Sequence, residues 1–183
     1  MSLSGSKTSR FVRRFLVPRI VASGIHWLRN RSKVSHRAEV DFSPNLRLGP
    51  RSTISSFAKI KVLRGQLVTG RRCQIGPGSF VSAHDGGIHI GDDFMCGPNV
   101  TIVSGSYEFA RLDIPFREQR AKSKGVRIGN NVSLGAGTVV IDGVHIGDNT
   151  MVMANSLVTR RFPPNCVLQG NPARIVLNRN KGS

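Results

Sequence analysis

A repeat of six residues runs from residue 128 to residue 163 and leaves few folds open to this chain. It reads IGNNVS, LGAGTV, VIDGVH, IGDNTM, VMANSL and VTRRFP, and the fifth place of most blocks holds a compact side chain. The first place of each block is aliphatic and is held by Ile128, Leu134, Val140, Ile146, Val152 and Val158. An α-helix needs apolar residues every 3.6 residues and a lone strand needs alternation, so neither explains a period of six. The repeat instead predicts a coil with flat sides, in which stacked turns bury a continuous aliphatic column.

Blocks of six also precede this stretch, with two irregularities and one long interruption. They begin at Leu48 with LGPRST and ISSFAK, slip in register over residues 61–68, and resume with TGRRCQ and IGPGSF. An insertion, SAHDGGIH, follows Val81 and precedes IGDDFM, CGPNVT and IVSGSY. Residues 108–125 then show no sixfold pattern and are rich in charge. A loop of this length inside a regular solenoid is typical of a functional segment or an interaction arm.

The chain of 183 residues is long enough for one domain with a substantial core. We expect a basic N-terminal segment over residues 1–40, a coil domain over 41–165 that carries the loop 108–125, and a closing strand with a basic tail over 166–183. Cys73 and Cys96 fall on repeat positions, so we expect buried thiols rather than disulfides or metal ligands. Free thiols favour a reducing, cytoplasmic compartment.

The first forty residues mix basic and apolar side chains. Lys and Arg recur between residues 7 and 37, with Phe11, Phe15, Ile20 and Trp27 among the apolar residues between them. The apolar run is too short and too interrupted to span a bilayer, and it lacks the cleavage site of a secretory signal. One interpretation is a basic amphipathic helix that lies on an anionic membrane surface. The other is a helix that packs on the domain or on partner chains.

The formal net charge of +17 indicates an anionic partner or a solvated basic surface. Nucleic acid is the first candidate, because a basic face releases counterions from phosphates. The chain shows no helix-turn-helix or zinc-finger motif, and with 1 Trp and 1 Tyr it has few aromatic residues for base stacking. We therefore expect no nucleic acid, and an anionic lipid, an acidic glycan and a phosphate-bearing cofactor stay open as explanations.

These repeats resemble those of the hexapeptide-repeat acyltransferases. The stretch from IGDNTM through GNPARIV is similar to the end of their repeat domain. DIPFREQ at residues 113–119, followed by IGNNVSLGAG, resembles the branch that O-acetylates sugars of surface polysaccharides. The resemblance covers about residues 48–176 and implies an all-β fold, the left-handed parallel β-helix. It also implies a homotrimer, with acetyl-CoA in the groove between the coils of neighbouring chains.

The resemblance further implies a set of residues that bind acetyl-CoA. It implies backbone contacts for Gly135, Ala136, Ala154 and Asn155, a place beside the adenine for Pro172, and phosphate contacts for Arg160, Arg161 and Arg174. CoA carries three phosphate groups, and each guanidinium offers several fixed donors to them. A solvated basic face is the alternative interpretation of the arginines.

Acetyl transfer to a hydroxyl needs a general base, a donor to the oxyanion, and substrates held in line. In the resembling sugar transferases a His stands just before the long loop and an aromatic residue follows two places later. Here Tyr107 occupies the place of the His, and Phe109 keeps the aromatic place. Tyrosine, with an ordinary pKa of about 10, is a poor general base. Two hypotheses follow: a transferase with another base, and a transferase-like scaffold without catalysis.

His84 is the first candidate for another base. The stretch AHDGGIHIGD around it resembles the catalytic-His segment of serine acetyltransferases, and Asp85 follows it directly. A carboxylate beside an imidazole orients the ring and supports its charged form. The alternative is an exposed turn histidine with Asp85 as a cap. Glu108 is the second candidate, because burial raises the pKa of a carboxylate, and its alternative role is to neutralise Arg111 or Arg117.

The sequence thus predicts a trimer that transfers an acetyl group from acetyl-CoA to a sugar hydroxyl. The expected acceptor is a surface glycan (lipopolysaccharide, capsule or exopolysaccharide) or its lipid-linked precursor. The expected place is the cytoplasm, at the inner face of the cytoplasmic membrane, where residues 7–37 would contact anionic lipid. The alternative is a catalytically degenerate scaffold or a CoA- or glycan-binding subunit.

Overall fold

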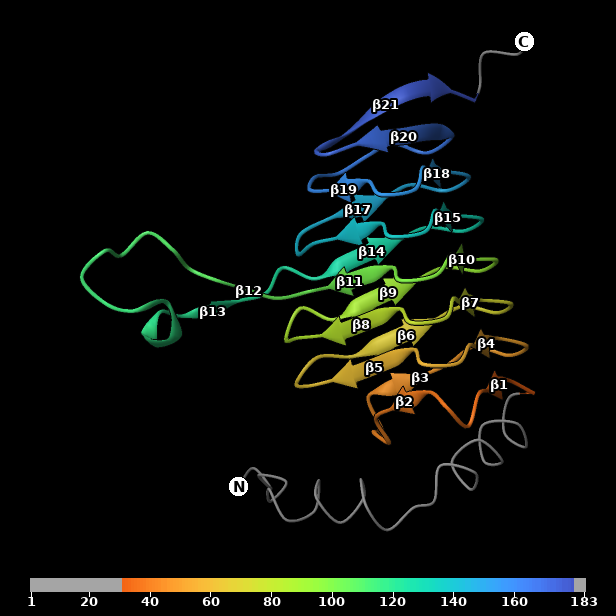
Figure 1. The fold of residues 1–183 in the computed structure, drawn as a ribbon, viewed down its shortest axis with the longest axis horizontal. Helices are drawn as coiled ribbons and strands as arrows, with labels where there is room; N and C mark the ends of the chain where they lie inside the picture. Colours follow the sequence, from red (N-terminus) through yellow and green to blue (C-terminus); the bar gives the residue numbers. More distant parts are fainter. Residues whose placement is uncertain (1–30, 180–183) are drawn as a thin grey trace.

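The computed structural model describes residues 31–179, which form a solenoid of short strands (Figure 1). The chain winds round three sheets, called here A, B and C, and successive coils pair in parallel. On sheet A, for example, Met95 lies between Gln74 of the preceding coil and Ser133 of the following one. The described residues contain no α-helix. The predicted all-β coil is confirmed, whereas the predicted N-terminal helix lies outside the described residues.

The strands of each sheet come from successive coils. Sheet A consists of β1 (Lys33–Val34), β4 (Thr53–Ile54), β7 (Gln74–Ile75), β10 (Met95–Cys96), β15 (Ser133–Leu134), β18 (Met151–Val152), β20 (Cys166–Gly170) and β21 (Ala173–Asn178). Sheet B consists of β2 (Glu39–Val40), β5 (Lys59–Val62), β8 (Phe80–Ala83), β11 (Thr101–Val103), β16 (Val139–Val140) and β19 (Leu157–Val158). Sheet C consists of β3 (Leu46–Arg47), β6 (Leu67–Thr69), β9 (Ile88–Ile90), β14 (Val126–Ile128) and β17 (His145–Ile146).

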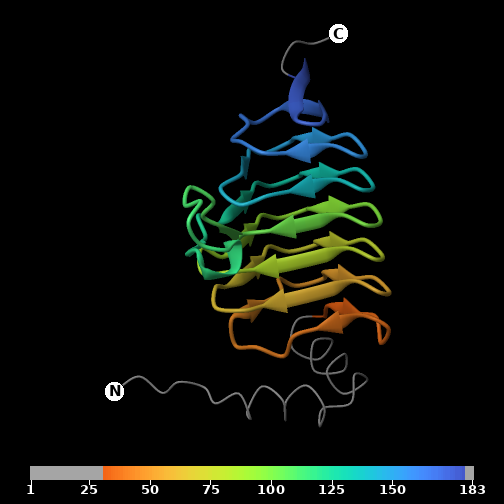
Figure 2. The same cartoon turned by 60° about the vertical axis from the view of Figure 1, so that its left-hand side comes forward.

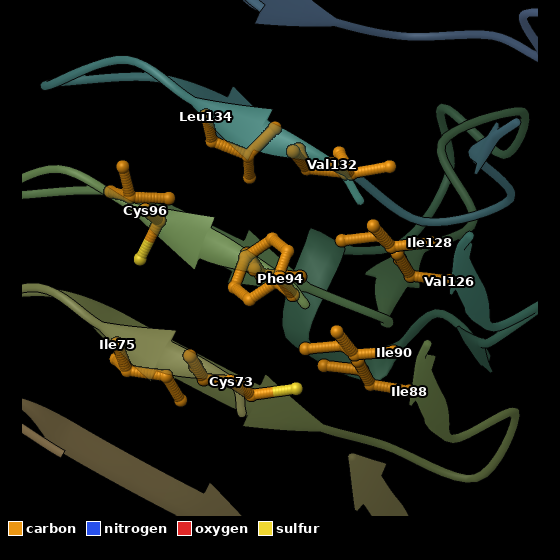
Figure 3. Close-up of a cluster of buried hydrophobic side chains, with 14 of the residues drawn as sticks. Cys73, Ile75, Ile88, Ile90, Phe94, Cys96, Val126, Ile128, Val132 and Leu134 are labelled. Carbon is orange, nitrogen blue, oxygen red and sulfur yellow. The ribbon is translucent and has the colours of Figure 1, made fainter. Parts of the chain in front are cut away.

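The first residue of each block points into the coil, as predicted. All six of these residues are buried: Ile128, Leu134, Val140, Ile146, Val152 and Val158. Successive blocks contribute to sheets C, A and B in turn, so one block makes one side of the coil. Figure 3 shows the stacked core, with Phe94 fully buried between Cys73 and Val132 of the adjacent coils.

The cysteines are part of this core. Cys73, Cys96 and Cys166 are free and buried, which confirms the prediction for the first two. Burial raises the pKa of the Cys73 and Cys96 thiols, so both resist ionisation. Within residues 31–179, no cluster of His, Cys, Asp and Glu is arranged to hold a metal ion. In the same range no helix is long and apolar enough to cross a membrane.

The corners explain why Gly and Asn follow the aliphatic positions. At successive corners between sheets A and B, one residue has a positive φ: Phe57, Gly78, Asn99, Gly137 and Asn155. Gly and Asn accept this left-handed conformation at low cost, whereas a bulky residue does not. Phe57 is the exception, and its exposed ring lies 5.9 Å from the Arg37 guanidinium.

Two details differ from the sequence analysis. The coil begins at Lys33, ahead of the expected domain start at residue 41 and of the first sixfold block at Leu48, because β1 and β2 already pair with β4 and β5. Val34, Val40 and Leu46 stand six residues apart on its first three strands, a repeat that the sequence analysis missed. The irregular stretches at 61–68 and 82–89 are one feature, a longer corner between sheets B and C that recurs in register in two coils.

The chain ends in a hairpin rather than in a single closing strand. β20 continues sheet A in parallel beside β18, and β21 then pairs antiparallel with β20. Figure 1 shows this hairpin at the end of the stack opposite to β1. It therefore terminates the regular parallel pairing of sheet A.

Candidate functional site

A long arm leaves the solenoid at the corner between sheets B and C. The arm, defined here as residues 106–122, connects β11 to β14 and carries β12 (Ser106–Tyr107), η1 (Phe116–Glu118) and β13 (Ala121–Lys122). β12 and β13 form an antiparallel stem. Figure 1 shows the arm projecting far from the coils, and Figure 2 shows it beside the middle of the stack.

The arm has a polar interior and an apolar surface. Gln119 is buried, and its Nε2 donates to the Arg111 carbonyl at 2.8 Å. Its apolar side chains are instead turned to solvent: Phe109 is 79 % exposed, Leu112 97 % and Phe116 68 %. Large apolar groups on a projecting segment are typical of an interaction site. Within the described part of the chain, these three side chains have no core to pack against.

His84 lies at the corner where the arm begins and ends. Its backbone N–H donates to Oγ of Ser104, a buried residue just before the stem, at 2.8 Å. Ser123, just after the stem, donates from Oγ to the Ser104 carbonyl. The same Oγ accepts the N–H of Gly86 at 2.7 Å. Both ends of the arm are therefore bonded to the corner that holds His84.

The His84 ring is held from two sides. Its Nε2 lies 3.4 Å from Ser82 Oγ, and the ring is half-buried. The backbone of Gly105 covers it so closely that a Cβ at this position would overlap the ring atoms. The imidazole is thus fixed against the root of the arm, and it can exchange a proton with any hydroxyl that reaches Nε2.

The other predicted catalytic residues are placed differently from expectation. Asp85 forms an ion pair with Arg64 at 3.0 Å, on the preceding coil, and no hydrogen bond joins it to the His84 ring. Tyr107 and Glu108 lie on the arm and are exposed in the single chain. Within this chain Glu108 therefore lacks the burial on which its candidacy as a base depended.

The alternative role of Glu108 is also not formed. Arg111 pairs with Asp113, and Arg117 lies 3.8 Å from Glu118, so both arginines have other acidic neighbours. The Arg111 guanidinium lowers the pKa of Asp113, which keeps this pair charged on the arm. Glu108 instead donates its backbone N–H to the Arg120 carbonyl across the stem.

Three residues at the root of the arm were missed by sequence analysis. They are Ser104, Ser123 and Asp142, whose carboxylate accepts the N–H of Lys124 and the N–H of Gly125, each at 2.8 Å. Ser104 and Asp142 belong to the repeat blocks IVSGSY and VIDGVH, but no block shows which residues of other coils lie beside them. In the structure, β11 pairs with β8 so that Val103 lies opposite Ser82, and this register brings the next residues beside His84.

The predicted cofactor residues are divided between two edges. Gly135, Ala136, Ala154 and Asn155 lie at the A–B corners of two adjacent coils, where Asn155 donates its N–H to the Ala136 carbonyl at 2.8 Å. The A–B edge bears little side-chain bulk here, since Ala136 and Ala154 are exposed and Gly135 lies directly against the Ala154 backbone. Pro172 follows β20, whose Gly170 donates its N–H to Ser156 Oγ at the same edge.

The predicted phosphate ligands are divided in the same way. Arg174 is exposed on β21, beyond the hairpin turn at the A–B edge. Arg160 lies at the B–C corner of the last coil, with its guanidinium 5.3 Å from the Phe162 ring, and Arg161 follows where the Ile146–Phe162 bridge continues sheet C. The A–B and B–C edges are separated by the width of sheet B, roughly 15–20 Å at about 3.3 Å per residue. One chain therefore does not bring His84 and the A–B edge together.

Sheet B, between these edges, has a neutral outward row from its third coil to its last. Strand pairing aligns Phe80, Thr101, Val139 and Leu157, and all four are only partly exposed. The first coils carry charge instead. There Lys61 and Lys59 hydrogen-bond Glu39 and lower the pKa of its carboxyl to about 2.

Comparison with known proteins agrees with this architecture. Residues 125–160 match the family described as bacterial transferase hexapeptide (six repeats). The galactoside O-acetyltransferase of Lactococcus lactis is 36% identical over 112 residues, 58% of this chain and 53% of the relative. WbbJ of Escherichia coli, named for O-acetyl transfer in lipopolysaccharide biosynthesis, is 28% identical over 144 residues, 79% of this chain and 63% of the relative. The chain spans about half the length of the galactoside O-acetyltransferases it matches.

Solved structures share the fold. The N-acyltransferase AntD of Bacillus cereus, crystallised with dTDP and 3-hydroxybutyryl-CoA, has a TM-score of 0.73 at 19% identity, over 81% of this chain and 80% of its own. PerB of Caulobacter crescentus, crystallised with CoA and GDP-perosamine, has a TM-score of 0.61 at 27% identity, over 79% of this chain and 56% of its own. Fold and repeat together define a hexapeptide-repeat solenoid. Over the matched regions the chain is similar to the hexapeptide-repeat acetyltransferases, in agreement with the resemblance drawn from the sequence.

Proposed function

We propose that this protein transfers an acetyl group from acetyl-CoA to a sugar hydroxyl of a surface glycan or of its lipid-linked precursor. The observation that carries the proposal is the His84 corner, bonded to both ends of the arm. The names of the relatives support the same reaction and acceptor class. We also propose that the coil is left-handed and that residues 7–37 contact the inner face of the membrane.

In this proposal His84 is the general base. Acetyl-CoA supplies the acyl group when it is bound. His84 takes the proton of the acceptor hydroxyl, whose oxygen bonds to the acetyl carbonyl carbon while the carbon–sulfur bond breaks. His84 then returns the proton to the departing thiolate, so charge and atoms balance. The contacts of its backbone N–H and of Gly105 hold the ring in place during both proton transfers.

The A–B edge suits a long, flexible donor. Ala136 and Ala154 are small and exposed there, so a ligand can approach the backbone closely. Arg174 at the end of this edge offers an exposed guanidinium to a phosphate group. We assign the donor to this edge, with Gly135, Asn155 and Pro172 as further contacts.

A homotrimer would join the two edges. If sheet B of each chain faces the threefold axis, the B–C edge of one chain meets the A–B edge of the next. The neutral row with Phe80 and Leu157 suits such an inner face. The exposed Phe109, Leu112 and Phe116 then pack on the neighbouring chain. The active site is complete only between chains, with Arg160 and Arg161 supplied from the same edge as His84.

The first test is isothermal titration with acetyl-CoA. The wild type should bind with micromolar affinity, and Arg174→Ala should weaken binding about tenfold because one charged phosphate contact is lost. Lys33→Ala, on the outward face of sheet A, is the matched control and should bind like the wild type. Absence of acetyl-CoA binding in the wild type would contradict the proposal.

A scaffold without catalysis is the second candidate. It is favoured by one observation: Tyr107 is exposed at the place where the resembling transferases carry a His. Release of free CoA thiol with glycan acceptors separates the two candidates. Turnover that falls at least a hundredfold in His84→Ala supports the transferase. Acetyl-CoA binding without turnover on any glycan supports the scaffold.

A further inference from the structure

The outward face of sheet C carries a row of basic residues in register over successive coils. The row consists of Arg47, Val68, His89, Arg127, His145 and Arg161. All except Val68 are exposed. Their neighbours in the strands point inward and are buried, as Ile88 and Ile90 are on either side of His89. The row therefore lies on a surface and runs parallel to the solenoid axis.

The strands of this face lack acidic residues, and the nearby Asp92 and Asp93 pair with other arginines. No strand of sheet C contains Asp or Glu, and among residues 31–179 no ion pair involves Arg47, Arg127 or Arg161. The carboxylates of Asp92 and Asp93 instead pair with arginines at the corner between sheets C and A. The row thus keeps its positive charge available to a partner.

The other two faces lack this property. The central outward row of sheet A is uncharged, with Thr53, Gln74, Met95, Ser133 and Met151 in register. The basic residues of sheet B, Lys59 and Lys61, are paired with Glu39. The positive charge of the solenoid faces is therefore concentrated on sheet C.

The spacing of the row fits a linear polyanion. Adjacent coils lie about 4.8 Å apart, so His89, Arg127, His145 and Arg161 present a positive or protonatable group at each step. A flat membrane fits less well, because the three sheet C faces of a trimer point in three directions. A nucleic acid fits less well too, since the row has no aromatic side chain other than imidazole for base stacking.

We infer that the outward face of sheet C binds an anionic glycan, whose carboxylate or phosphate groups contact the row. This face ends at the B–C corner, where Lys124 is exposed and His84 lies at the root of the arm. A glycan on sheet C would therefore reach the proposed base with one of its hydroxyls. Its role as the acetyl acceptor rests on the proposed function, whereas its binding does not.

Filling the gap in the row gives the sharpest test. Val68→Lys adds a cation between Arg47 and His89, and Met95→Lys adds the same charge to the outward face of sheet A. Binding of fluorescent oligogalacturonate is measured by anisotropy at two salt concentrations, with neutral dextran oligomers as the reference. We expect Val68→Lys to tighten binding about threefold or more and Met95→Lys to leave it unchanged. An equal gain in both variants would contradict a specific face.

Loss of charge provides the complementary measurement on the full-length chain. Arg47→Gln combined with Arg127→Gln should weaken oligogalacturonate binding about tenfold and reduce its salt dependence, because two counterion-releasing contacts are removed. Lys33→Gln is the control and should have no effect. If phosphorylated dextran binds the wild type and these variants in the same order of affinity, that result also supports the inference. The inference would be overturned if single-stranded DNA bound more tightly than the glycans with the same order of affinity among the variants, or if the double substitution had no effect.

The affinity of the same variants for acetyl-CoA should stay unchanged, so failure of this inference is distinct from failure of the proposed function.

Discussion

At Gly105 the absence of a side chain determines how closely the arm approaches His84. A Cβ there would overlap the imidazole, and the atoms in the way belong to the ring rather than to a flexible chain end. The ring is also near Ser82, so it has little room to move aside. A single methyl group at this position should therefore displace the proposed base.

The variant Gly105→Ala tests this at the residue scale. We expect acetyl transfer to fall at least tenfold while acetyl-CoA affinity stays unchanged, because the donor is assigned to the other edge. Ser106→Ala, an exposed neighbour on β12, is the control and should keep the wild-type rate. Equal rates for Gly105→Ala and the wild type would show that the ring position is irrelevant to turnover.

Glu39 gives a pH-dependent contribution to stability. Hydrogen bonds from Lys61 lower the pKa of its carboxyl from 4.5 to about 2. A lowered folded-state pKa stabilises the fold above the ordinary pKa, and this stabilisation disappears as pH falls towards 2. Glu39→Gln should therefore lower the free energy of unfolding by about 1 kcal/mol at pH 7, a discounted figure for a partly exposed pair. Denaturant unfolding at pH 7 and near pH 2 should show that the difference vanishes in acid; an undiminished difference near pH 2 would refute the assignment.

Among the elements, the corners between sheets C and A form a ladder of amides. Asn131 Nδ2 donates to Asn149 Oδ1 at 2.9 Å, and Asn149 Nδ2 donates to Asn165 Oδ1 at 3.0 Å. All three residues have a positive φ, which Asn tolerates better than most residues. The ladder thus joins the last coils to the residue that begins the closing hairpin.

Two substitutions at Asn149 separate its contributions. Asn149→Gly removes the amide bonds but keeps the backbone conformation, and should cost about 1 kcal/mol. Asn149→Ala adds the strain of a positive φ and should cost about 2 kcal/mol. Thermal unfolding monitored by circular dichroism gives both values. Equal destabilisation by Asn149→Ala and Asn149→Gly would contradict a cost of the positive φ at this position.

The elements that repeat were predictable, and those that interrupt the repeat were not. Ile128 and Leu134 could be placed inward because a fixed period puts equivalent residues at equivalent positions. The bonds of Ser104 and Ser123 could not be predicted, because they depend on which residues of different coils stack at one corner. The pairing of Asp85 with Arg64 rather than with His84 has the same origin, a contact between coils.

For the whole molecule, the arrangement of the two edges matters most. His84 and the arm lie on the B–C edge, and Ala154 with Arg174 lies on the A–B edge. Sheet B separates them within one chain, so a site that uses both requires two chains. A cyclic trimer forms three such sites, each from one edge of each kind.

The most direct test of this central claim is complementation between two inactive variants. His84→Ala damages only the B–C edge, and Ala154→Trp blocks only the A–B edge, where Ala154 is exposed. Each homotrimer should be inactive in acetyl transfer. When the two variants are refolded together in equal amounts, about three quarters of the trimers are mixed, and each mixed trimer has one intact site of its three. Activity should therefore recover to about a quarter of the wild-type value. Mixed trimers confirmed by native mass spectrometry that remain inactive would contradict a site shared between chains.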